Sequence, residues 1–297
     1  MAARAVGVIP ARYGATRFPG KVLGLIAGRP MLQHVVERAR RARLLDEVLV
    51  ATDDARVREA AEAAGARAVM TSPHHPSGTD RIAEVARDIA CEVVANIQGD
   101  EPTLDPAAVD AAVAPLLDDP AILMTTLCTP IRRDADARDP NTVKVVCDRR
   151  GYALYFSRAA IPYYRDAAAG VPGFGFRVPG DPEPATRDPE RGTRNPEPGT
   201  VLWRKHIGLY AYRREVLLQL ADLPPTALEQ AEHLEQLRAL EHGIRILVIE
   251  TARDSIGVDV PEDLARVAAL LAGPESRVAG RGSHRGPGDP GPETRDP

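Results

Sequence analysis

Positively charged side chains and glycines are concentrated at residues 10–21, directly after an apolar run at 5–9. Glycine lets a backbone approach an anion closely, and Arg and Lys neutralise its charge. The spacing matches neither GxGxxG nor GxxxxGK(S/T), and the next helix is expected near Pro30, too late to bind a dinucleotide with its N-terminus. We therefore interpret 10–21 as a side-chain clamp on a triphosphate, with an ordinary basic turn as the alternative. The residues that carry this interpretation are Arg12, Gly14, Arg17, Gly20 and Lys21.

Carboxylates follow other expected strands. Asp100 comes directly after an apolar run at 92–97, and Gly99 beside it allows a close approach. Asp259 lies on a Gly-Val-Asp turn before a helix, where capping that helix is the alternative role. Few hard oxygen ligands suit Mg²⁺ that is held jointly with phosphates. The pattern therefore predicts a nucleotide bound with Mg²⁺, with Asp100 as the best ligand candidate and Asp259 as the second, although spacing alone favours the capping role for Asp259.

A loop rich in hydroxyl groups spans residues 71–81 and ends at a helix cap. His74 and His75 lie in this loop, but no third ligand has a spacing suited to zinc. No GxSxG sequence is present, which argues against a serine hydrolase. The loop is therefore interpreted as part of a binding site and not as a metal centre.

These side chains need elements that bring them together. Apolar runs typical of buried parallel strands alternate with patterns typical of amphipathic helices. Strands are expected at 5–9, 47–51, 68–70 and 92–97, and helices at 31–43, 55–64, 80–90 and 106–117. This alternation predicts an α/β fold with a doubly wound, mostly parallel sheet. Ligands bind beyond the carboxyl ends of such strands, where the polar loops 10–21, 71–81 and 98–102 all fall.

The alternation of strands and helices ends after a strand expected at 121–128. Strands at 143–147 and 152–157, joined by a turn, predict a smaller antiparallel subdomain. A strand at 202–212 follows. Its alternation places four residues on one face, namely His206, Gly208, Tyr210 and Tyr212.

A helix is expected over 227–242. Glu235 would lie on the same side of it as Leu228 and Ala231, which is the packed side. A carboxylate buried without a partner is costly, so Glu235 either has a polar partner or lies at a rim exposed to water.

Two segments have a composition that cannot form a core. Pro, Gly and charged residues dominate 166–200, and Gly180–Pro189 nearly repeats at the end as Gly288–Pro297. Proline at this density blocks helix and sheet. We therefore expect a disordered low-complexity insertion at 173–200 and a similar tail at 273–297, with a proline-rich partner-binding motif as the alternative.

Overall composition excludes several classes of protein. With 297 residues and 44% hydrophobic content the chain can bury a substantial core. A net charge of −4 argues against general nucleic-acid binding, and no apolar run approaches membrane-spanning length. Its three cysteines lack CxxC spacing, so neither a disulfide framework nor a zinc site is expected. These features predict a soluble cytoplasmic protein without membrane insertion.

Seven motifs occur in an order that makes a resemblance specific. They are PARxxxTRFPGK at 10–21, SGTDR at 77–81, NIQGDEP at 96–102, YFSRAxIP at 155–162, HIGLY at 206–210, LEQLR at 234–238 and GVD at 257–259. The chain resembles the CMP-Kdo synthetases, the 3-deoxy-manno-octulosonate cytidylyltransferases, within the CMP-sugar synthetases. The resemblance covers roughly 4–165 and 202–271. The first motif is shared among CMP-sugar synthetases, whereas the third and sixth point to the Kdo enzyme.

The resemblance implies a Rossmann-like nucleotide-diphospho-sugar-transferase fold over residues 1–272, with 129–213 contributing a smaller dimerisation subdomain of a homodimer. It implies transfer of a cytidylyl group from CTP to 3-deoxy-D-manno-octulosonate (Kdo), with Mg²⁺ and release of pyrophosphate, for lipopolysaccharide biosynthesis. The implied catalytic residues are Arg12, Lys21, Asp100 and Asp259, of which Asp100 and Asp259 bind the metal. The implied nucleotide-binding residues are Ala11, Arg12, Lys21, Ser77, Gly78, Arg81, Gln98 and Asp100. The implied sugar-binding residues are Gln98, Arg158, His206, Tyr210, Glu235 and Gln236.

Two other functions remain open on the sequence. A cytidylyltransferase for a nonulosonic acid, such as a sialic acid, would share the loop at 10–21 and differ in the sugar pocket. A catalytically inactive nucleotide-binding protein is the other alternative. The insertion falls between Arg158 and His206, but loop-closure entropy grows only logarithmically with length, so we expect activity to survive it.

Overall fold

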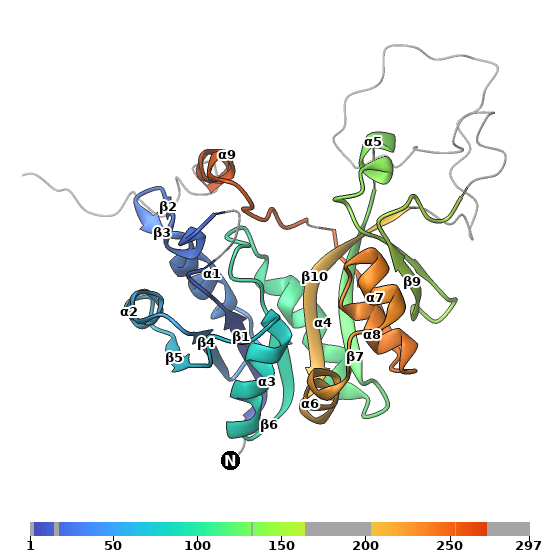
Figure 1. Cartoon of the computed structure of the whole chain (residues 1–297), viewed down its shortest axis with the longest axis horizontal. Helices are drawn as coiled ribbons and strands as arrows, with labels where there is room; N and C mark the ends of the chain where they lie inside the picture. Colours follow the sequence, from blue (N-terminus) through green and yellow to red (C-terminus); the bar gives the residue numbers. More distant parts are fainter. Residues whose placement is uncertain (1–2, 15–17, 132, 164–202, 253, 272–297) are drawn as a thin grey trace, which may run out of the picture.

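A nine-stranded sheet organises the part of the chain that the structure describes, which is residues 3–14, 18–131, 133–163, 203–252 and 254–271 of a computed structural model (Figure 1). Its main path has the strand order β11-β7-β10-β6-β1-β4-β5, and β8 and β9 extend it beyond β10. The strands are β1 (Ala3–Pro10), β4 (Glu47–Thr52), β5 (Arg67–Met70), β6 (Cys91–Asn96), β7 (Met124–Pro130), β8 (Lys144–Cys147), β9 (Ala153–Ser157), β10 (Arg204–Arg213) and β11 (Ile246–Glu250). A separate antiparallel pair consists of β2 (Leu25–Ile26) and β3 (Arg29–Pro30).

Helices cover both faces of this sheet. They are α1 (Met31–Ala39), α2 (Ala55–Ala63), α3 (Gly78–Asp88), α4 (Pro106–Asp118), α5 (Asp134–Arg138), α6 (Arg214–Asp222), α7 (Ala227–Glu232), α8 (Gln236–Glu241), α9 (Pro261–Leu271) and the 3-10 helix η1 (Lys21–Leu23). α1, α2, α4 and α9 contribute to one hydrophobic cluster, and α3, α6 and α8 contribute to the other. The core is therefore divided between the two faces of the sheet.

β1 supplies side chains to both hydrophobic clusters. Ala5 and Ile9 belong to the first cluster, whereas Val6 and Val8 belong to the second. A strand that buries successive side chains on opposite faces lies in the centre of a sheet, as its apolar sequence predicts. β1 pairs in parallel with β4 and β6, and β4 pairs in parallel with β5. The predicted doubly wound, mostly parallel α/β fold is confirmed.

The predicted hairpin at 143–157 is also confirmed. β8 and β9 pair antiparallel, and β8 in turn pairs with the start of β10. β10 runs antiparallel between β6 and β7, a position that its sequence did not indicate. The smaller antiparallel part is thus continuous with the main sheet.

The strand order reverses at β1. The chain proceeds from β1 to β4 and β5 on one side, and β6 returns to the other side of β1. The loops that leave β1 and β6 therefore diverge at a switch point, where open α/β sheets bind ligands. A Cβ atom on Gly99 would lie only 3.0 Å from the carbonyl oxygen of Pro10, so glycine is required where these two loops approach.

The prediction of a single helix at 227–242 is wrong. The chain forms α7 and α8, because His233 adopts a left-handed conformation with φ of 51° between them. Glu235 consequently occupies the N-cap position of α8. Leu228 is 40% exposed, so Glu235 does not share a buried helical face with it.

The low-complexity segments expected at 173–200 and 273–297 lie outside the described residues. Among the helices that the structure does describe, none has the length and apolar character needed to cross a membrane.

Candidate active site

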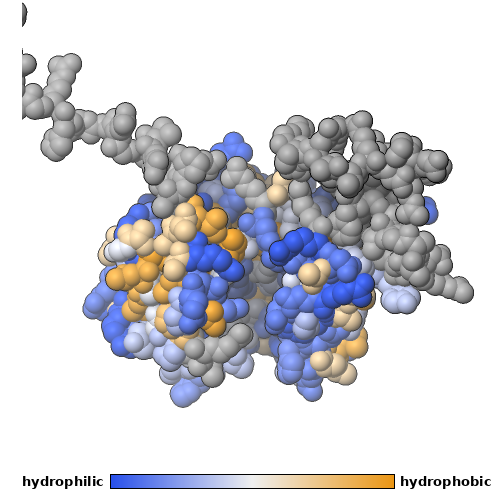
Figure 2. Space-filling model, turned by 90° about the horizontal axis from the view of Figure 1, so that it is seen from above, coloured by the Kyte–Doolittle hydropathy of each residue, from blue (hydrophilic) through white to orange (hydrophobic). Residues whose placement is uncertain are grey.

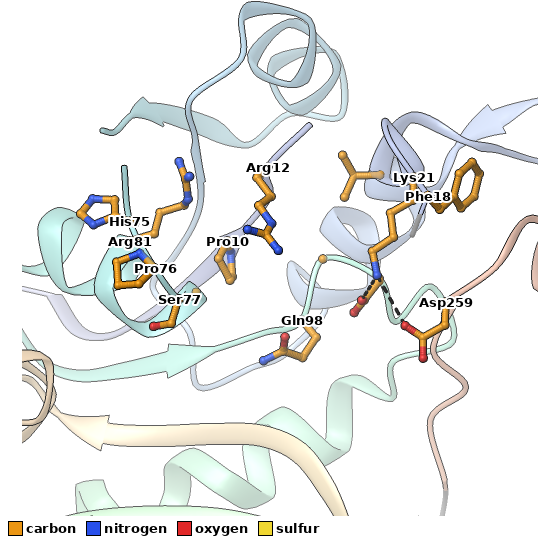
Figure 3. A pocket seen from close by; sticks show the side chains of 14 residues that line it. Pro10, Arg12, Phe18, Lys21, His75, Pro76, Ser77, Arg81, Gln98 and Asp259 are labelled. Carbon is orange, nitrogen blue, oxygen red and sulfur yellow. Dashed lines mark hydrogen bonds and ion pairs between the residues drawn. The ribbon is translucent and has the colours of Figure 1, made fainter. Parts of the chain in front are cut away.

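A cleft with a volume of about 370 Å³ opens at the carboxyl ends of β1 and β6. Figure 2 shows, from above, the hollow between the two halves of the molecule. The lining residues come from the loop after β1, the start of α3, the loop after β6 and the loop before α9. They are Pro10, Arg12, Phe18, Lys21, Val22, His75, Pro76, Ser77, Gly78, Arg81, Gln98, Gly99, Asp100 and Asp259 (Figure 3).

Lys21 and two carboxylates form the charged end of the cleft. The Lys21 Nζ atom lies 2.5 Å from Asp100 Oδ2 and 3.8 Å from Asp259 Oδ1. It also donates to the carbonyl oxygen of Val258 at 3.3 Å. Two loops far apart in the sequence thus converge on one ammonium group (Figure 3).

On the sequence, the alternative role of Asp259 is to cap the following helix. Its backbone N–H donates to Asp263 Oδ2 at 2.9 Å, and its own carboxylate lies toward Lys21. The structure therefore places the Asp259 carboxylate beside Lys21, and its role as a metal ligand stays a prediction. Among the described residues no group of three or more His, Cys, Asp or Glu side chains is arranged to hold a metal ion. Any cation at this pair must take its remaining ligands from backbone, water or substrate.

Tyr13 shapes the loop that presents Lys21. Gly20 has φ of 72°, and its N–H donates to the carbonyl oxygen of Tyr13 at 2.7 Å. A Cβ atom on Gly20 would lie 2.9 Å from the Tyr13 ring, so glycine is required on both counts. On α2, the Arg56 guanidinium lies 3.5 Å from the centroid of the same ring and is also bonded to the carboxylate of Asp54.

The other wall of the cleft begins at α3. Ser77 caps this helix, accepting the backbone N–H of Asp80 at 3.1 Å and donating to the Asp80 carboxylate at 2.6 Å. Arg81 is buried, and its guanidinium donates to Thr71 Oγ1 at 2.5 Å and to Asp53 Oδ2 at 3.2 Å. The loop rich in hydroxyl groups is therefore anchored to the end of β4 by its own arginine.

His75 is a lining residue that the sequence did not single out for binding. Its ring bonds to the Glu84 carboxylate, which also accepts the backbone N–H of Ser72 at 3.0 Å. These hydrogen bonds hold the pKa of Glu84 below its ordinary value against the effect of burial. Glu84 therefore fixes both ends of the loop segment 72–75 to α3.

A second polar cluster extends from the cleft toward β10. Gln98 Nε2 donates to the carbonyl oxygen of Gly208 at 3.1 Å and to Asn96 Oδ1 at 3.2 Å. His206 and Tyr210 lie in contact, with ring centroids 5.3 Å apart, although the register of β10 against β7 shifts between them. Gln98 thus connects the charged end to β10.

Burial keeps the histidine in this cluster neutral. His206 is buried, which lowers its pKa from 6.5 to about 3. Its Nε2 atom lies 2.9 Å from Thr126 Oγ1, and that hydroxyl also faces the carbonyl oxygens of Ile207 and Leu209. The hydroxyl hydrogen is needed for one of these carbonyls, so we assign the His206 proton to Nε2. His206 suits a hydroxyl partner better than the positive half of an ion pair.

Glu235 connects α8 to the start of α3. Its carboxylate accepts the hydroxyl of Thr79 and is close to that of Ser77. Burial raises its pKa above the ordinary value. The expectation that this carboxylate has a polar partner is confirmed. Beside it, the buried Gln236 Nε2 finds no acceptor among the described residues.

Arg158 is held away from the cleft. Its guanidinium donates to the carbonyl oxygens of Glu232 at 2.7 Å and Pro140 at 3.0 Å. Its own carbonyl oxygen accepts the ammonium of the fully buried Lys144 at 2.5 Å. The same ammonium donates to the carbonyl oxygens of Asp139 at 2.9 Å and Thr142 at 2.5 Å, and burial lowers its pKa.

The structure brings some of the expected site residues together and leaves others outside the cleft. Those that line it are Arg12, Lys21, Ser77, Gly78, Arg81, Gln98, Asp100 and Asp259. Those that do not are Ala11, Arg158, His206, Tyr210, Glu235 and Gln236. Ala11 is buried directly after β1. Glu235 adds to the rise in the pKa of Tyr210 that burial causes, so Glu235 and the adjacent Gln236 are counted with His206 and Tyr210 in the second polar cluster. Phe18 and His75 were missed, and the position of His75 two residues before the Ser-Gly-Thr cap was the available signal.

A crevice at the switch point of a mostly parallel sheet, with cations from one loop facing carboxylates from two others, defines the class of nucleotidyltransferases. The family model for cytidylyltransferases matches residues 6–246. A 3-deoxy-manno-octulosonate cytidylyltransferase of Geobacter sulfurreducens is 52% identical over 89% of this chain and 98% of that protein. One from Solibacter usitatus is 49% identical over 91% of this chain and 96% of that protein. The chain belongs to the family of 3-deoxy-manno-octulosonate cytidylyltransferases.

A solved structure agrees with this assignment. CMP:2-keto-3-deoxy-manno-octonic acid synthetase complexed with CTP has a TM-score of 0.77 and 44% identity, over 91% of this chain and 98% of that one. A 4-diphosphocytidyl-2C-methyl-D-erythritol synthase from Anaerococcus prevotii has a TM-score of 0.53 at 12% identity and shows the common fold alone.

Proposed function

We propose that the protein transfers the cytidylyl group of CTP to Kdo, giving CMP-Kdo and pyrophosphate for lipopolysaccharide biosynthesis. The observation that carries the proposal is the continuity of two unlike clusters. A charged end with Lys21 between Asp100 and Asp259 suits a metal-bound triphosphate, and Gln98 connects it to a neutral cluster suited to a polyol. The relatives with this name cover most of the chain.

The charged end would bind and orient the triphosphate. Arg12 is exposed and extends into the cleft, so its guanidinium is free to approach phosphate oxygens (Figure 3). Lys21 would neutralise the charge that develops on the departing pyrophosphate. Asp100 and Asp259 fit Mg²⁺, because their carboxylates and the Val258 carbonyl already surround one cation. When bound, Mg²⁺ polarises the phosphoryl oxygens and lowers the pKa of the attacking hydroxyl.

The wall of the cleft at α3 would hold the cytidine. Ser77, Gly78 and Arg81 would surround the cytidine, and the buried Ala11 would shape the floor of this part of the cleft. Positioning then accounts for most of the rate in this chemistry. The anomeric hydroxyl of Kdo attacks the α-phosphorus in line, the bond to the β-phosphate breaks, and the hydroxyl proton is lost to solvent.

The second polar cluster would bind Kdo. Neutral His206 and Tyr210 suit its hydroxyls, and the unpaired Nε2 of Gln236 is a donor that a substrate oxygen would satisfy. Glu235 would accept hydrogen bonds from sugar hydroxyls while keeping its bond to Thr79. Arg158 suits the Kdo carboxylate, but its guanidinium would have to exchange its carbonyl partners for it.

We further propose a cytoplasmic homodimer in which residues 129–213 contribute the smaller dimerisation subdomain. Among the described strands β9 pairs only with β8, and just before it Tyr152 forms a single bridge to Leu247 of β11, so most of the other edge of β9 is unpaired. Leu154 on β9 is 63% exposed, and Tyr163 is 85% exposed. Exposed apolar side chains beside a free edge are typical of an interaction surface.

Pyrophosphate release measured with a panel of nucleotides and sugar acids tests the proposed reaction. We expect turnover with CTP, Kdo and Mg²⁺ and much weaker turnover with other nucleoside triphosphates or a sialic acid. Preference for a nine-carbon acid would assign the protein to the other branch of CMP-sugar synthetases. Release from none of the combinations would favour an inactive nucleotide-binding protein.

A further inference from the structure

Lys21 occupies the position in which the proposed function requires a metal ion. Its ammonium has three oxygen neighbours, which are Asp100 Oδ2, Asp259 Oδ1 and the carbonyl oxygen of Val258. Resting on the proposed function, we propose that Lys21 is a built-in competitor of the divalent cation. The ammonium pairs with the carboxylates when the site is empty and moves to the triphosphate when the metal enters.

The oxygen cage is fixed by backbone contacts and not by side chains alone. The Val258 N–H donates to the carbonyl oxygen of Asp100 at 2.9 Å, which fastens the loop before α9 to the loop after β6. A second bond runs from the Ile256 N–H to Thr103 Oγ1 at 2.8 Å. Neither bond involves Lys21, so they hold the two loops that carry the carboxylates together with or without a cation. Such a preformed site needs a counter-ion, because facing carboxylates repel.

Lysine is well suited to this role. The ammonium is a compact point charge on a flexible stem, so it can take the place of a metal ion and then swing away, whereas a guanidinium is planar and larger. The chain has only three lysines among 38 Lys and Arg residues, and Lys21 is one of them. Its side chain is 17% exposed, so its ion pair with Asp100 is only partly screened by water.

The Lys21 ammonium and a divalent ion cannot both remain between the two carboxylates, because their charges repel. Two carboxylates balance one divalent ion, and an ammonium that remained within 4 Å of that ion would be repelled by it. The incoming triphosphate offers the ammonium new anionic partners. It follows that the metal alone binds weakly, and that metal and nucleotide strengthen each other's binding through Lys21. By linkage this coupling acts equally in both directions.

Titration with Mn²⁺ alone, followed by the electron paramagnetic resonance of the free ion, tests this proposal in the full-length protein. We expect Lys21→Met to bind Mn²⁺ about tenfold more tightly than the wild type, since a nearby repelling charge is removed. Lys21→Arg retains the charge and should bind as weakly as the wild type. The tightening should disappear in Lys21→Met combined with Asp100→Asn. Lys205→Met is the matched control, because it removes an ion pair with Asp254 at 2.8 Å elsewhere.

A second measurement follows the ammonium itself. With ¹³Cε-labelled lysine the chain gives three side-chain signals, and Mg²⁺ without nucleotide should shift the Lys21 signal while that of Lys205 stays in place. Equal Mn²⁺ affinity in Lys21→Met and wild type, or a Lys21 signal that does not move as Mg²⁺ saturates the site, would overturn the proposal. Neither experiment uses nucleotide or sugar acid. A failed turnover assay would therefore rule out the proposed reaction but would not decide whether Lys21 competes with the metal. Equal Mn²⁺ affinities would likewise rule out the competition but not the reaction.

Discussion

The charged end of the cleft and the second polar cluster beside it, here called the neutral end, are built in opposite ways. At the charged end, Lys21 begins the short helix η1, Asp100 and Asp259 lie on loops, and Asp259 is exposed. At the neutral end, His206 lies within β10 and is buried, and Glu235 bonds to the first turn of α3. The charged end can exchange partners as a metal and a triphosphate arrive. At the neutral end, His206 and Glu235 already have hydrogen-bond partners within the protein.

This difference suggests a division of labour. Interactions made by groups that change partners during the reaction act on the rate, whereas a preformed set of hydrogen-bonding groups acts on which substrate is accepted. Ser77 and Thr79 connect the two ends, since both hydroxyls lie at the start of α3 and near the Glu235 carboxylate. The predictions below test this division from its largest expected effect to its smallest.

Asp100→Asn should give the largest loss. It removes a carboxylate from the proposed metal site, and we expect turnover to fall by about 10³-fold. Pyrophosphate release measures the rate, and thermal unfolding shows whether the variant is folded. Asp254→Asn is the control, because that carboxylate pairs with Lys205 outside the cleft. Near-normal turnover of Asp100→Asn would remove this residue from the metal site.

Glu235→Gln should affect the sugar acid selectively. Loss of a charged hydrogen-bond acceptor typically costs about 10- to 100-fold, so kcat/KM for Kdo should fall by that factor. The KM for CTP should change little, because Glu235 does not line the cleft in which the nucleotide would bind. Glu241→Gln on the exposed side of α8 is the control. An equal increase in both KM values would show that the two ends do not act separately.

His206→Gln should alter how stability depends on pH. Between 6.5, its ordinary pKa, and about 3, its pKa in the folded protein, the unfolded state binds a proton that the folded state does not. The wild type therefore loses stability as the pH falls through this window. From about pH 6.5 to pH 5 the loss should be ~2 kcal/mol larger than in the variant, which has no imidazole to protonate. Urea unfolding at both pH values gives the difference, and the same change in both proteins would contradict the buried neutral histidine.

Arg56→Ala should have the smallest effect. The Arg56 guanidinium packs on Tyr13, which in turn contacts Gly20 and so the loop that carries Lys21. A partly exposed cation–π contact is weak, so we expect turnover to fall by about two- to fivefold. Arg58→Ala on the same helix is the control. If the two variants were equally active, Arg56 would have no part in positioning the loop.

The charged end was more accessible to sequence reasoning than the neutral end. Glycines, cations and carboxylates directly after apolar strands mark the loops at 10–21 and 98–102, and parallel pairing brings strand ends together. The neutral end depends on long-range contacts. The break at His233 lies in a segment without Gly or Pro, so the left-handed residue could not be foreseen, and with it the approach of Glu235 to Thr79.

β10 illustrates the same limit. Its sequence predicts a strand, but its place between β6 and β7, and the register shift between Ile207 and Tyr210, follow from pairing partners far away in the chain. His75 was missed for a related reason, because only the fold shows that Glu84 holds it at the cleft.

The three lysines give the protein a sparse set of side-chain amines for chemical labelling. Lys144 is fully buried among three carbonyl oxygens, and Lys205 is 33% exposed beside Asp254. An amine-directed reagent would therefore modify Lys205 more readily than Lys144, which would react only on unfolding. Labelling at Lys21 would report the occupancy of the cleft, and the other two positions would serve as internal standards for exposure and folding in the same sample.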